Sequence, residues 1–465
     1  MNFLQLLTLL RRAAMTMVAV SISLVAGGIR ISAQAAKNAP GSEPVVHLKA
    51  VSTLTDSYSG PEDAVQALRS GQATPLSLVA CDVDGDGVTD LIVGNGVPGG
   101  GGILTVHRGN LEAFVPQSEE TFKYMAAGKF QDSILPGASA FPTKVRPDFL
   151  AAGNFYQSGH IGVVVAARGG NTINVLTGNG YGVFTVAQSL SLPGGAAVTA
   201  LGAGKIGAIG QPDSVLIGVQ GPQQPLLLLY RSSAAGMVLV NTYALPAPAM
   251  AFAFGDLDGH LVPDAAAVIA GGQLLMLHSG RPEASPALAP ISLPFSVSAM
   301  ALGSFAFDRN RRLQMALLSP DGALHIMAPN GFKGDPWTPE ELETLRQVRL
   351  GKSPSPFHPT SNNHQEEWKE VESFSGLAPF DSAGRLPLLL RTRSGGGGGD
   401  VITVFNRDAD QTAVISHPYA RHGVAEFARG QTVVRTGSTR AIVAAVPMRL
   451  NVGATSGVLA ISGGK

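Results

Sequence analysis

Four aspartates near the start of the chain have the spacing of a metal-binding loop. Asp82, Asp84, Asp86 and Asp90 stand at relative positions 1, 3, 5 and 9 of one loop, with Gly85 and Gly87 between them. Carboxylates this close require a counter-charge, and the glycines allow the backbone to curl until the carboxylates converge. Ca²⁺ takes about six to eight oxygen ligands, and the carbonyl of Val88 would add one to the four carboxylates. The loop therefore predicts a Ca²⁺ site.

The residues after the loop separate this pattern from other calcium motifs. An EF-hand requires a glutamate at about position 12, where this chain has Val93. A β-branched apolar run, Leu91–Val93, follows the loop and indicates a strand where an EF-hand has a helix. The alternative interpretation is an Asp/Gly hairpin turn that binds no metal.

Composition limits the classes of partner. Lys and Arg together number 33, as do Asp and Glu, so the balanced charge favours neither nucleic acid nor an anionic membrane as a partner. A single cysteine, Cys81, excludes an intrachain disulfide. The neighbouring carboxylates would raise the pKa of its thiol, so we expect a buried, inert residue and not a nucleophile.

The amino terminus has the features of an export signal. Arg11 and Arg12 precede an apolar run, Ala13–Gly27, and Ala33–Gln34–Ala35 has the small residues of a cleavage site. The general secretory route fits these residues better than the twin-arginine route. An uncleaved anchor is the alternative, but the run is short for a membrane span. We therefore predict a signal peptide over residues 1–35, no membrane span after its cleavage, and a secreted, periplasmic or cell-surface monomer.

A repeat of about 50 residues organises the rest of the chain. Each copy contains a small-residue approach, a loop, an apolar strand, a turn and a second apolar strand. The loops begin near residues 82, 154, 205, 256, 304, 379 and 432. This repeat length is typical of one four-stranded blade of a β-propeller, and blades must stack because one alone cannot cover its two apolar faces. The predicted fold is all-β, a β-propeller of seven four-stranded blades with a short helical insert, with six to eight blades left open.

Three domain-level segments follow from this repeat. Residues 36–75 are expected to form a linker, a short helix over 61–69 and a strand, Val45–Val51, that completes the last blade. Residues 76–465 form the propeller, with inserts at 110–147 and 333–374. Trp337 and Trp368 flank the second insert. They predict either an exposed platform for a partner or contacts that fix the insert to the propeller.

The repeated loops resemble the FG-GAP/VCBS-type blades that also form the head of integrin α-subunits, and the resemblance covers residues 76–461. Asp82, Asp84, Asp86 and Asp90 match the metal loop of that family fully. Asp256, Asp258 and Asp264 match in part, with His260 at the third ligand position and Leu261 in place of a glycine. The resemblance implies Ca²⁺ at both loops. The remaining copies have other residues at the first ligand position: Asn154, Lys205, Ser304 and Pro379.

Three functions remain open at the level of sequence. The first is an exported, non-catalytic binding or adhesion propeller that recognises a protein or glycan with the loops of one face. The second is an extracellular enzyme, a lyase or hydrolase, that acts on polysaccharide. The third is a structural component of the cell envelope. We prefer the first, because no nucleophile motif or cofactor loop is present and the histidines lack the paired spacing of a transition-metal site.

Overall fold

The computed structural model describes residues 57–462, apart from 157–158, 208–209, 235, 260, 280–287, 311, 336, 355–366, 381–385, 394–398, 407–410, 417–429, 436–441 and 451–455. The predicted signal peptide and the predicted closing strand at 45–51 lie outside the described residues.

The first sheet contains the aspartate-rich loop. Its strands lie in the order β1-β5-β4-β3-β2, and β1 pairs with β5 in parallel while the others are antiparallel. Helix α2 (Glu62–Arg69) packs Ala64 against Ile103 and Ala140 of this sheet. The strands are β1 (Tyr58–Ser59), β2 (Thr74–Cys81), β3 (Asp90–Gly96), β4 (Gly102–His107) and β5 (Ala138–Thr143).

Five further sheets contain four antiparallel strands each, and the described part of a seventh contains two. In chain order the strands are β6 (Phe149–Gly153), β7 (Gly162–Ala166), β8 (Thr172–Gly178) and β9 (Phe184–Ser191); β10 (Ala197–Gly204), β11 (Ser214–Gln220), β12 (Pro225–Ser233) and β13 (Gly236–Ala244); β14 (Ala249–Gly255), β15 (Asp264–Ile269), β16 (Leu274–Leu277) and β17 (Ala289–Ile291); β18 (Ala299–Gly303), β19 (Gln314–Leu318), β20 (Leu324–Pro329) and β21 (Trp368–Phe374); β22 (Leu388–Arg393), β23 (Asp400–Asn406), β24 (Gln411–Ser416) and β25 (Gly430–Arg435); and β26 (Ile442–Met448) with β27 (Gly457–Ser462).

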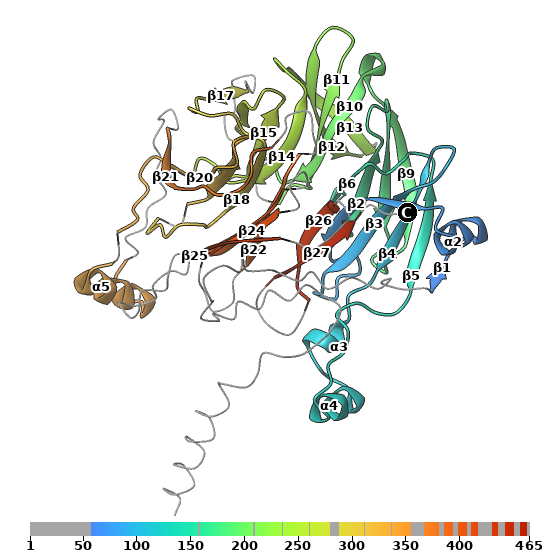
Figure 1. Ribbon diagram of the computed structural model, residues 1–465, viewed down its shortest axis with the longest axis horizontal. Coiled ribbons are helices and arrows are strands. Elements are labelled where there is room, and N and C mark those ends of the chain that lie inside the picture. Colours follow the sequence, from blue (N-terminus) through green and yellow to red (C-terminus); the bar gives the residue numbers. More distant parts are fainter. Residues whose placement is uncertain are drawn as a thin grey trace, which may run out of the picture.

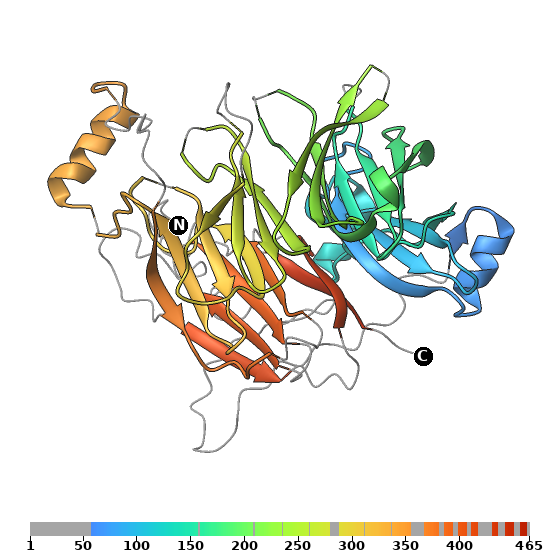
Figure 2. The same cartoon turned by 90° about the horizontal axis from the view of Figure 1, so that it is seen from above.

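The first strands of the seven sheets form a closed ring. Strand β2 contacts β6, and the contacts continue through β10, β14, β18 and β22 to β26, which contacts β2 again. Figure 1 shows the sheets fanning out around these strands, and Figure 2 shows the same arrangement from above. This is a β-propeller, as the sequence predicts. Because only two strands of the seventh sheet are described, seven complete four-stranded blades remain a prediction.

The hydrophobic core lies between sheets. One cluster joins Ile92 and Leu104 of the first sheet to Val163 and Leu176 of the second. Equivalent clusters join each later sheet to the next, as far as the contact of Phe405 with Ile442 between the sixth and seventh. Each blade therefore covers the apolar face of its neighbour, which is the reason that a lone blade would not be stable.

The outer strands explain where the predicted inserts end. Second strands such as β7 and β19 are buried along their whole length, whereas in the outer strand β9 only Phe184 is buried and the other residues are half-buried or exposed. Outer strands therefore lack the continuous apolar run of an inner strand. As a result, β5 lies within the range 110–147, and β21 lies within 333–374. In both cases the insert ends before the outer strand begins.

The loop positions predicted for the last two copies are wrong. Strand β22 is the first strand of the sixth sheet, so Pro379 lies in the connection between two sheets and not in a loop equivalent to Asp82. Residue 432 lies in β25, the outer strand of the sixth sheet, and the seventh sheet begins with β26. These copies lack an acidic loop to fix the register, and apolar strands of one blade resemble each other too closely to do so.

Three short helices lie in the inserts: α3 (Leu111–Phe114), α4 (Glu119–Ala126) and α5 (Pro339–Arg349). A capping box begins α5, because the Thr338 hydroxyl accepts from the Glu341 N–H at 3.3 Å and the Glu341 carboxylate accepts from the Thr338 N–H at 2.8 Å. The Arg309 guanidinium lies 4.9 Å from the Trp337 ring centroid and 2.8 Å from Glu341. Trp368 is buried in the core. Trp337 therefore fixes the insert to the propeller, whereas Trp368 belongs to the blade itself. Among the described residues, no helix has the length and apolarity to span a membrane.

Removal of the predicted closing strand should destabilise the whole ring. In the described part of the chain, β27 pairs with β26 alone, which leaves one of its edges available to a further strand. We expect a chain that starts at residue 53 to melt more than about 5 °C below one that starts at residue 36, measured by calorimetry. Equal melting temperatures and equal solubility would contradict closure by residues 45–51.

Candidate metal centres

The first loop, between β2 and β3, is curled by its own carboxylates. Asp82 accepts hydrogen bonds from the Gly85 N–H at 2.7 Å and from the Gly87 N–H at 2.9 Å. Asp86 accepts one from the Val88 N–H at 2.7 Å. Both glycines have positive φ, 77° and 83°, a conformation that costs other residues free energy. The sequence of alternating aspartate and glycine thus produces a tight turn with its carboxylates on one side.

Three of the four predicted carboxylates converge in this loop. One oxygen each of Asp82, Asp84 and Asp86 lies within 4.8 Å of the others. Ligand oxygens of one Ca²⁺, each about 2.3–2.6 Å from the ion, fall within such a distance of each other. Burial raises the pKa of Asp86, and the charges of Asp84 and Asp82 raise it further. A bound cation would relieve this repulsion, so the residues present fit Ca²⁺. The carbonyl of Val88 as a ligand stays a prediction.

Asp90 has a different role from the other three. It is fully buried, and its two oxygens accept hydrogen bonds from the Val83 N–H at 2.8 Å and the Gly109 N–H at 2.6 Å. Burial raises its pKa to about 6, against the effect of these two hydrogen bonds. Asp90 is not in the cluster of three but joins the loop to the residues that follow β4.

Arg108 supplies a cation at the first loop. It follows β4, and its guanidinium forms an ion pair with Asp84. Its side chain is 48% exposed, so it can leave the carboxylate without disturbing the core. The spacing of residues in the loop does not indicate Arg108, because the contact joins positions 24 residues apart.

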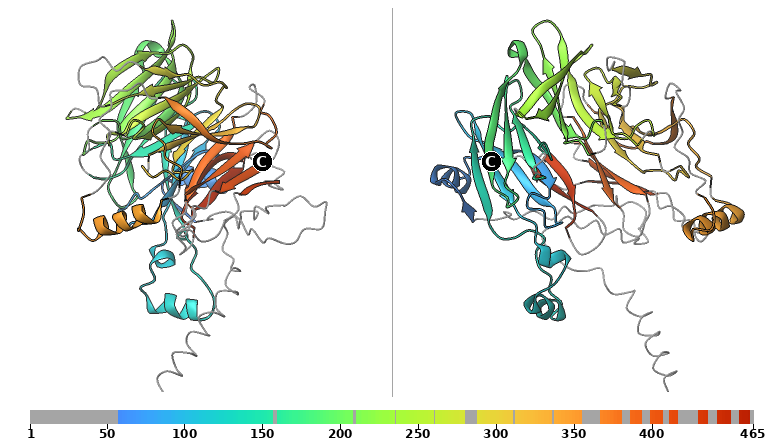
Figure 3. Two further views of the ribbon diagram at one scale, coloured as in Figure 1. Left: turned by 90° about the vertical axis from the view of Figure 1, so that its left-hand side faces the viewer. Right: turned by 180° about the vertical axis from the view of Figure 1, so that it is seen from behind.

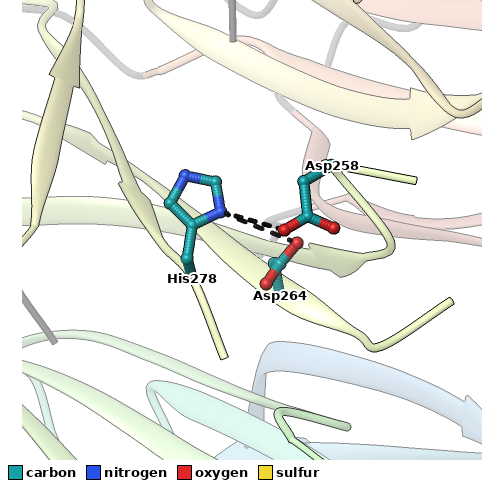
Figure 4. A group of neighbouring side chains, drawn as sticks. All are labelled: Asp258, Asp264 and His278. Carbon is teal, nitrogen blue, oxygen red and sulfur yellow. Dashed lines mark ion pairs between the residues drawn. The ribbon is translucent and has the colours of Figure 1, made fainter. Parts of the chain in front are cut away.

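The loop between β14 and β15 repeats this design with two differences. Asp256 accepts from the Gly259 N–H at 2.8 Å and the Leu261 N–H at 3.0 Å, as Asp82 does in the first loop. Asp264 is buried and accepts from the Leu257 N–H at 3.2 Å and the Ser279 N–H at 2.8 Å, as Asp90 does. The residues whose ligand atoms converge are Asp258, Asp264 and His278, and Asp256 is not among them (Figure 4).

His278 was not predicted as part of the site, although the repeat contains the signal. Leu91 pairs with His107 in the first sheet, and Ala265 pairs with Leu277 in the fourth. His278 therefore occupies the register position of Arg108. Alignment of the two copies through the third strand would have found it.

Cys81, at the end of β2, is half-buried and not fully buried as the sequence predicts. Burial raises the pKa of its thiol to about 12, with smaller contributions from the charges of Asp90 and Asp82. At neutral pH it stays protonated and is a poor nucleophile.

Ser319, His325 and Glu370 have the connectivity of a hydrolytic triad but not its accessibility. The Ser319 hydroxyl lies 3.4 Å from His325 Nε2, and His325 Nδ1 lies 2.6 Å from Glu370. Ser319 is only 2% exposed, and its hydroxyl donates to Asp321 and to the Ala323 carbonyl. A substrate cannot approach this hydroxyl, so the network stabilises the β19–β20 hairpin.

The comparisons with known proteins agree with the blade assignment. The FG-GAP repeat family matches residues 74–107, the range from β2 through β4 that contains the first loop. No relative was found among curated proteins. Similar solved structures include two crystal structures of BBS1N in complex with ARL6DN, one soaked with mercury and one with lead, and a protein from Lactobacillus plantarum.

All three structural likenesses are distant. The two BBS1N structures are 14% identical, cover 84% of this chain and 88% and 89% of theirs, and give TM-scores of 0.46 and 0.47. The Lactobacillus plantarum protein is 11% identical, with coverage of 78% and 85% and a TM-score of 0.42. At these values the likenesses carry no information about function.

Calcium should stabilise the chain through the first loop, in competition with Arg108. We expect an affinity of about 10⁻⁴ to 10⁻³ M and a melting temperature that rises with Ca²⁺, because an ion that binds only the folded state stabilises it. Asp84→Asn should abolish most of this shift. Arg108→Ala removes the competing cation and should raise Ca²⁺ affinity roughly two- to tenfold in calorimetric titration.

Arg146→Ala is the matched control, because Arg146 is also 48% exposed and ion-paired, with Asp148. It should leave calcium binding unchanged. A full calcium-dependent shift in Asp84→Asn would show that the ligand assignment is wrong.

Relief of backbone strain in the second loop should stabilise the protein. Leu261 has a φ of 62° where the first loop has Gly87, and it is the only residue other than glycine with positive φ in the described part of the chain. A left-handed backbone conformation costs a residue with a side chain about 1–2 kcal/mol of folding free energy. Leu261→Gly removes this cost, but part of the gain is offset because glycine makes the unfolded chain more flexible. We expect the free energy of unfolding, measured in denaturant, to be up to about 1 kcal/mol higher for Leu261→Gly. Leu261→Ala should give no such increase in stability. If Leu261→Gly were less stable than the unmodified chain, the interpretation that Leu261 is strained would be wrong.

Proposed function

We propose that this chain, an FG-GAP β-propeller, is an exported, calcium-stabilised binding protein without catalytic activity, and that it recognises a protein or glycan at one end of its ring. The observation that carries this proposal is a group of exposed aromatic side chains on the first insert, whose base is bonded to the first metal loop.

Both inserts and both aspartate loops belong to one end of the propeller. The loops join the first strand of a sheet to its second, and the inserts join the third strand to the outer one. In an antiparallel sheet these two connections turn at the same end. Figure 3 shows α3 with α4, and separately α5, projecting away from the sheets. The inserts therefore add surface at this end of the ring, beyond what four-stranded blades alone would provide.

The first insert presents an apolar surface. We call residues 111–132, which contain α3 and α4, the knob. Four of its large apolar side chains are between 42% and 54% exposed: Val115, Phe122, Tyr124 and Phe130. Exposed aromatic side chains are typical anchors of protein interfaces, and flat rings also stack on the apolar faces of sugars. Such a surface suits a protein or glycan partner.

The knob is attached directly to the first metal loop. Arg108 pairs with Asp84, and the Gly109 N–H donates to Asp90. The returning chain closes the stem, since the Leu135 N–H donates to the Arg108 carbonyl at 2.8 Å and the Asn110 N–H donates to the Ser133 carbonyl at 3.0 Å. An ion bound in the loop would therefore change contacts at the base of the knob. This contact supports a link between calcium and partner binding.

The enzyme and the structural component are the competing functions. An enzyme requires accessible reacting groups, and the serine of the triad-like network described above is only 2% exposed. A structural component requires no specific ligand. Assays of ligand binding and of polysaccharide turnover distinguish these two functions from that of a binding protein.

Substitution of the knob aromatics should abolish partner binding while the propeller stays folded. The test is a glycan array and an array of extracellular proteins, probed with the purified chain in the presence of Ca²⁺. We expect a ligand whose affinity falls about tenfold or more in the combined variant Phe122→Ala, Tyr124→Ala and Phe130→Ala, because buried aromatic anchors dominate such interfaces. Chelation of calcium should weaken the same binding.

The combined variant Val186→Ala and Val240→Ala is the matched control, because these residues are 52% and 44% exposed on outer strands far from the knob in the sequence. It should bind as the unmodified chain does. Deletion of residues 338–350, which removes α5 but spares β21, tests the second insert separately. Turnover of a polysaccharide would establish the enzyme, and no ligand on either array would favour the structural role.

A further inference from the structure

The second loop brings together a nitrogen and two oxygen donors. His278 follows β16, Asp258 lies in the β14–β15 loop and Asp264 begins β15, so three separate segments supply the group (Figure 4). His278 Nδ1 lies 3.6 Å from Asp258 Oδ2 and 3.9 Å from Asp264 Oδ2. One ligand atom from each residue falls within 4.8 Å of the others.

These separations match the ligands of a small dication better than a hydrogen-bonded pair. Hydrogen bonds of this type span about 2.7–3.2 Å. Zn²⁺ binds nitrogen and oxygen ligands at about 2.0–2.2 Å in tetrahedral geometry, which places two ligands about 3.4 Å apart. Both distances from His278 exceed the hydrogen-bond range and lie close to this edge length. A small inward movement of the side chains would bring these three ligand atoms to that spacing and leave the fourth tetrahedral position to water.

Neighbouring groups hold the carboxylate of Asp264 in place. Its side chain is 1% exposed. The Leu257 and Ser279 N–H groups and the Ser279 hydroxyl, at 3.2 Å, all donate to it. Such contacts orient a metal ligand and are as characteristic of real sites as the ligands themselves. The side chains of Asp258 and His278 are 12% and 17% exposed, which leaves a route from solvent.

The first loop is an internal reference for this site. At the register position of His278 it has Arg108, a permanent cation that pairs with Asp84 and cannot donate a lone pair to a metal. The second loop has an imidazole there, and imidazole is a common ligand of Zn²⁺ and similar ions. Ca²⁺ prefers oxygen ligands, whereas imidazole nitrogen shifts preference to borderline transition-metal ions.

We propose that Asp258, Asp264 and His278 form a second metal site that binds a borderline divalent transition-metal ion such as Zn²⁺ in preference to Ca²⁺. This site differs from the calcium loop that the family resemblance implies for Asp256, Asp258 and Asp264. Asp256 shapes the backbone of the loop, and His278 determines the class of metal.

The test titrates the purified full chain, without a histidine tag, with Zn²⁺ in the presence of 1 mM-scale Ca²⁺, so that the first loop is supplied with its own ion. We expect one Zn²⁺ per chain, which His278→Ala and Asp258→Asn weaken at least tenfold. His278→Arg, which copies the first loop, should abolish it. Co²⁺ should give visible absorption bands in the unmodified chain that His278→Ala loses.

Two controls separate the site from scattered histidines and from misfolding. His325→Ala removes a histidine that is 14% exposed and also lies beside a carboxylate, that of Glu370, and it should leave Zn²⁺ binding unchanged. The calcium-dependent rise in melting temperature shows whether each variant is folded. Equal Zn²⁺ affinity in the unmodified chain and His278→Ala, displacement of Zn²⁺ by equimolar Ca²⁺, or no Zn²⁺ binding by the folded chain would each overturn the proposal.

Discussion

The ring depends on apolar faces that no sheet can cover alone. Second strands such as β3, β7 and β11 are buried along nearly their whole length, and the clusters that bury them lie between one sheet and the next. Stability therefore comes from stacking around the whole ring, and closure of β26 on β2 removes the last free face. Loops at the ends of the sheets contribute little to this stability. They can acquire metal ligands, lose them or grow into inserts without loss of the fold.

A buried acceptor at the start of the second strand holds these loops. Asp90 and Asp264 accept from the backbone N–H groups of Val83 and Leu257. In the fifth sheet Gln314 pairs with Gly303 as Asp90 pairs with Cys81, and its side-chain oxygen accepts from the Phe305 N–H at 2.8 Å. A neutral amide performs the same task, so the shared requirement is satisfaction of backbone donors and not a cation. This accounts for a ring in which only two loops gather potential ligands in the described part of the chain.

The sequence predicts this fold well where a chemical pattern fixes the register. Aspartates mark the first and fourth loops, and continuous apolar runs mark the inner strands, so the propeller and the converging group of Asp82, Asp84 and Asp86 follow from short-range spacing. Strands β5 and β21 were not predicted, because neither has the continuous apolar run of an inner strand and both include half-buried or exposed residues, as an insert does. Arg108 and His278 escape for another reason: they approach their loops through the pairing of the third strand with the second, which depends on register and not on spacing along the chain.

One register position gives the two loops different chemistry and different consequences. Arg108 partly neutralises the first group of carboxylates, and a dication there must displace it from Asp84. His278 replaces this permanent cation with an imidazole, which adds a nitrogen donor to the carboxylates of Asp258 and Asp264. The residues after Arg108 form the stem of the knob, with Gly109 bonded to Asp90 and Asn110 bonded to Ser133. An ion that moves Arg108 therefore acts at the base of the proposed binding surface. An ion bound beside His278 changes contacts in the fourth blade. Its effect on the knob would have to pass through the packing between blades.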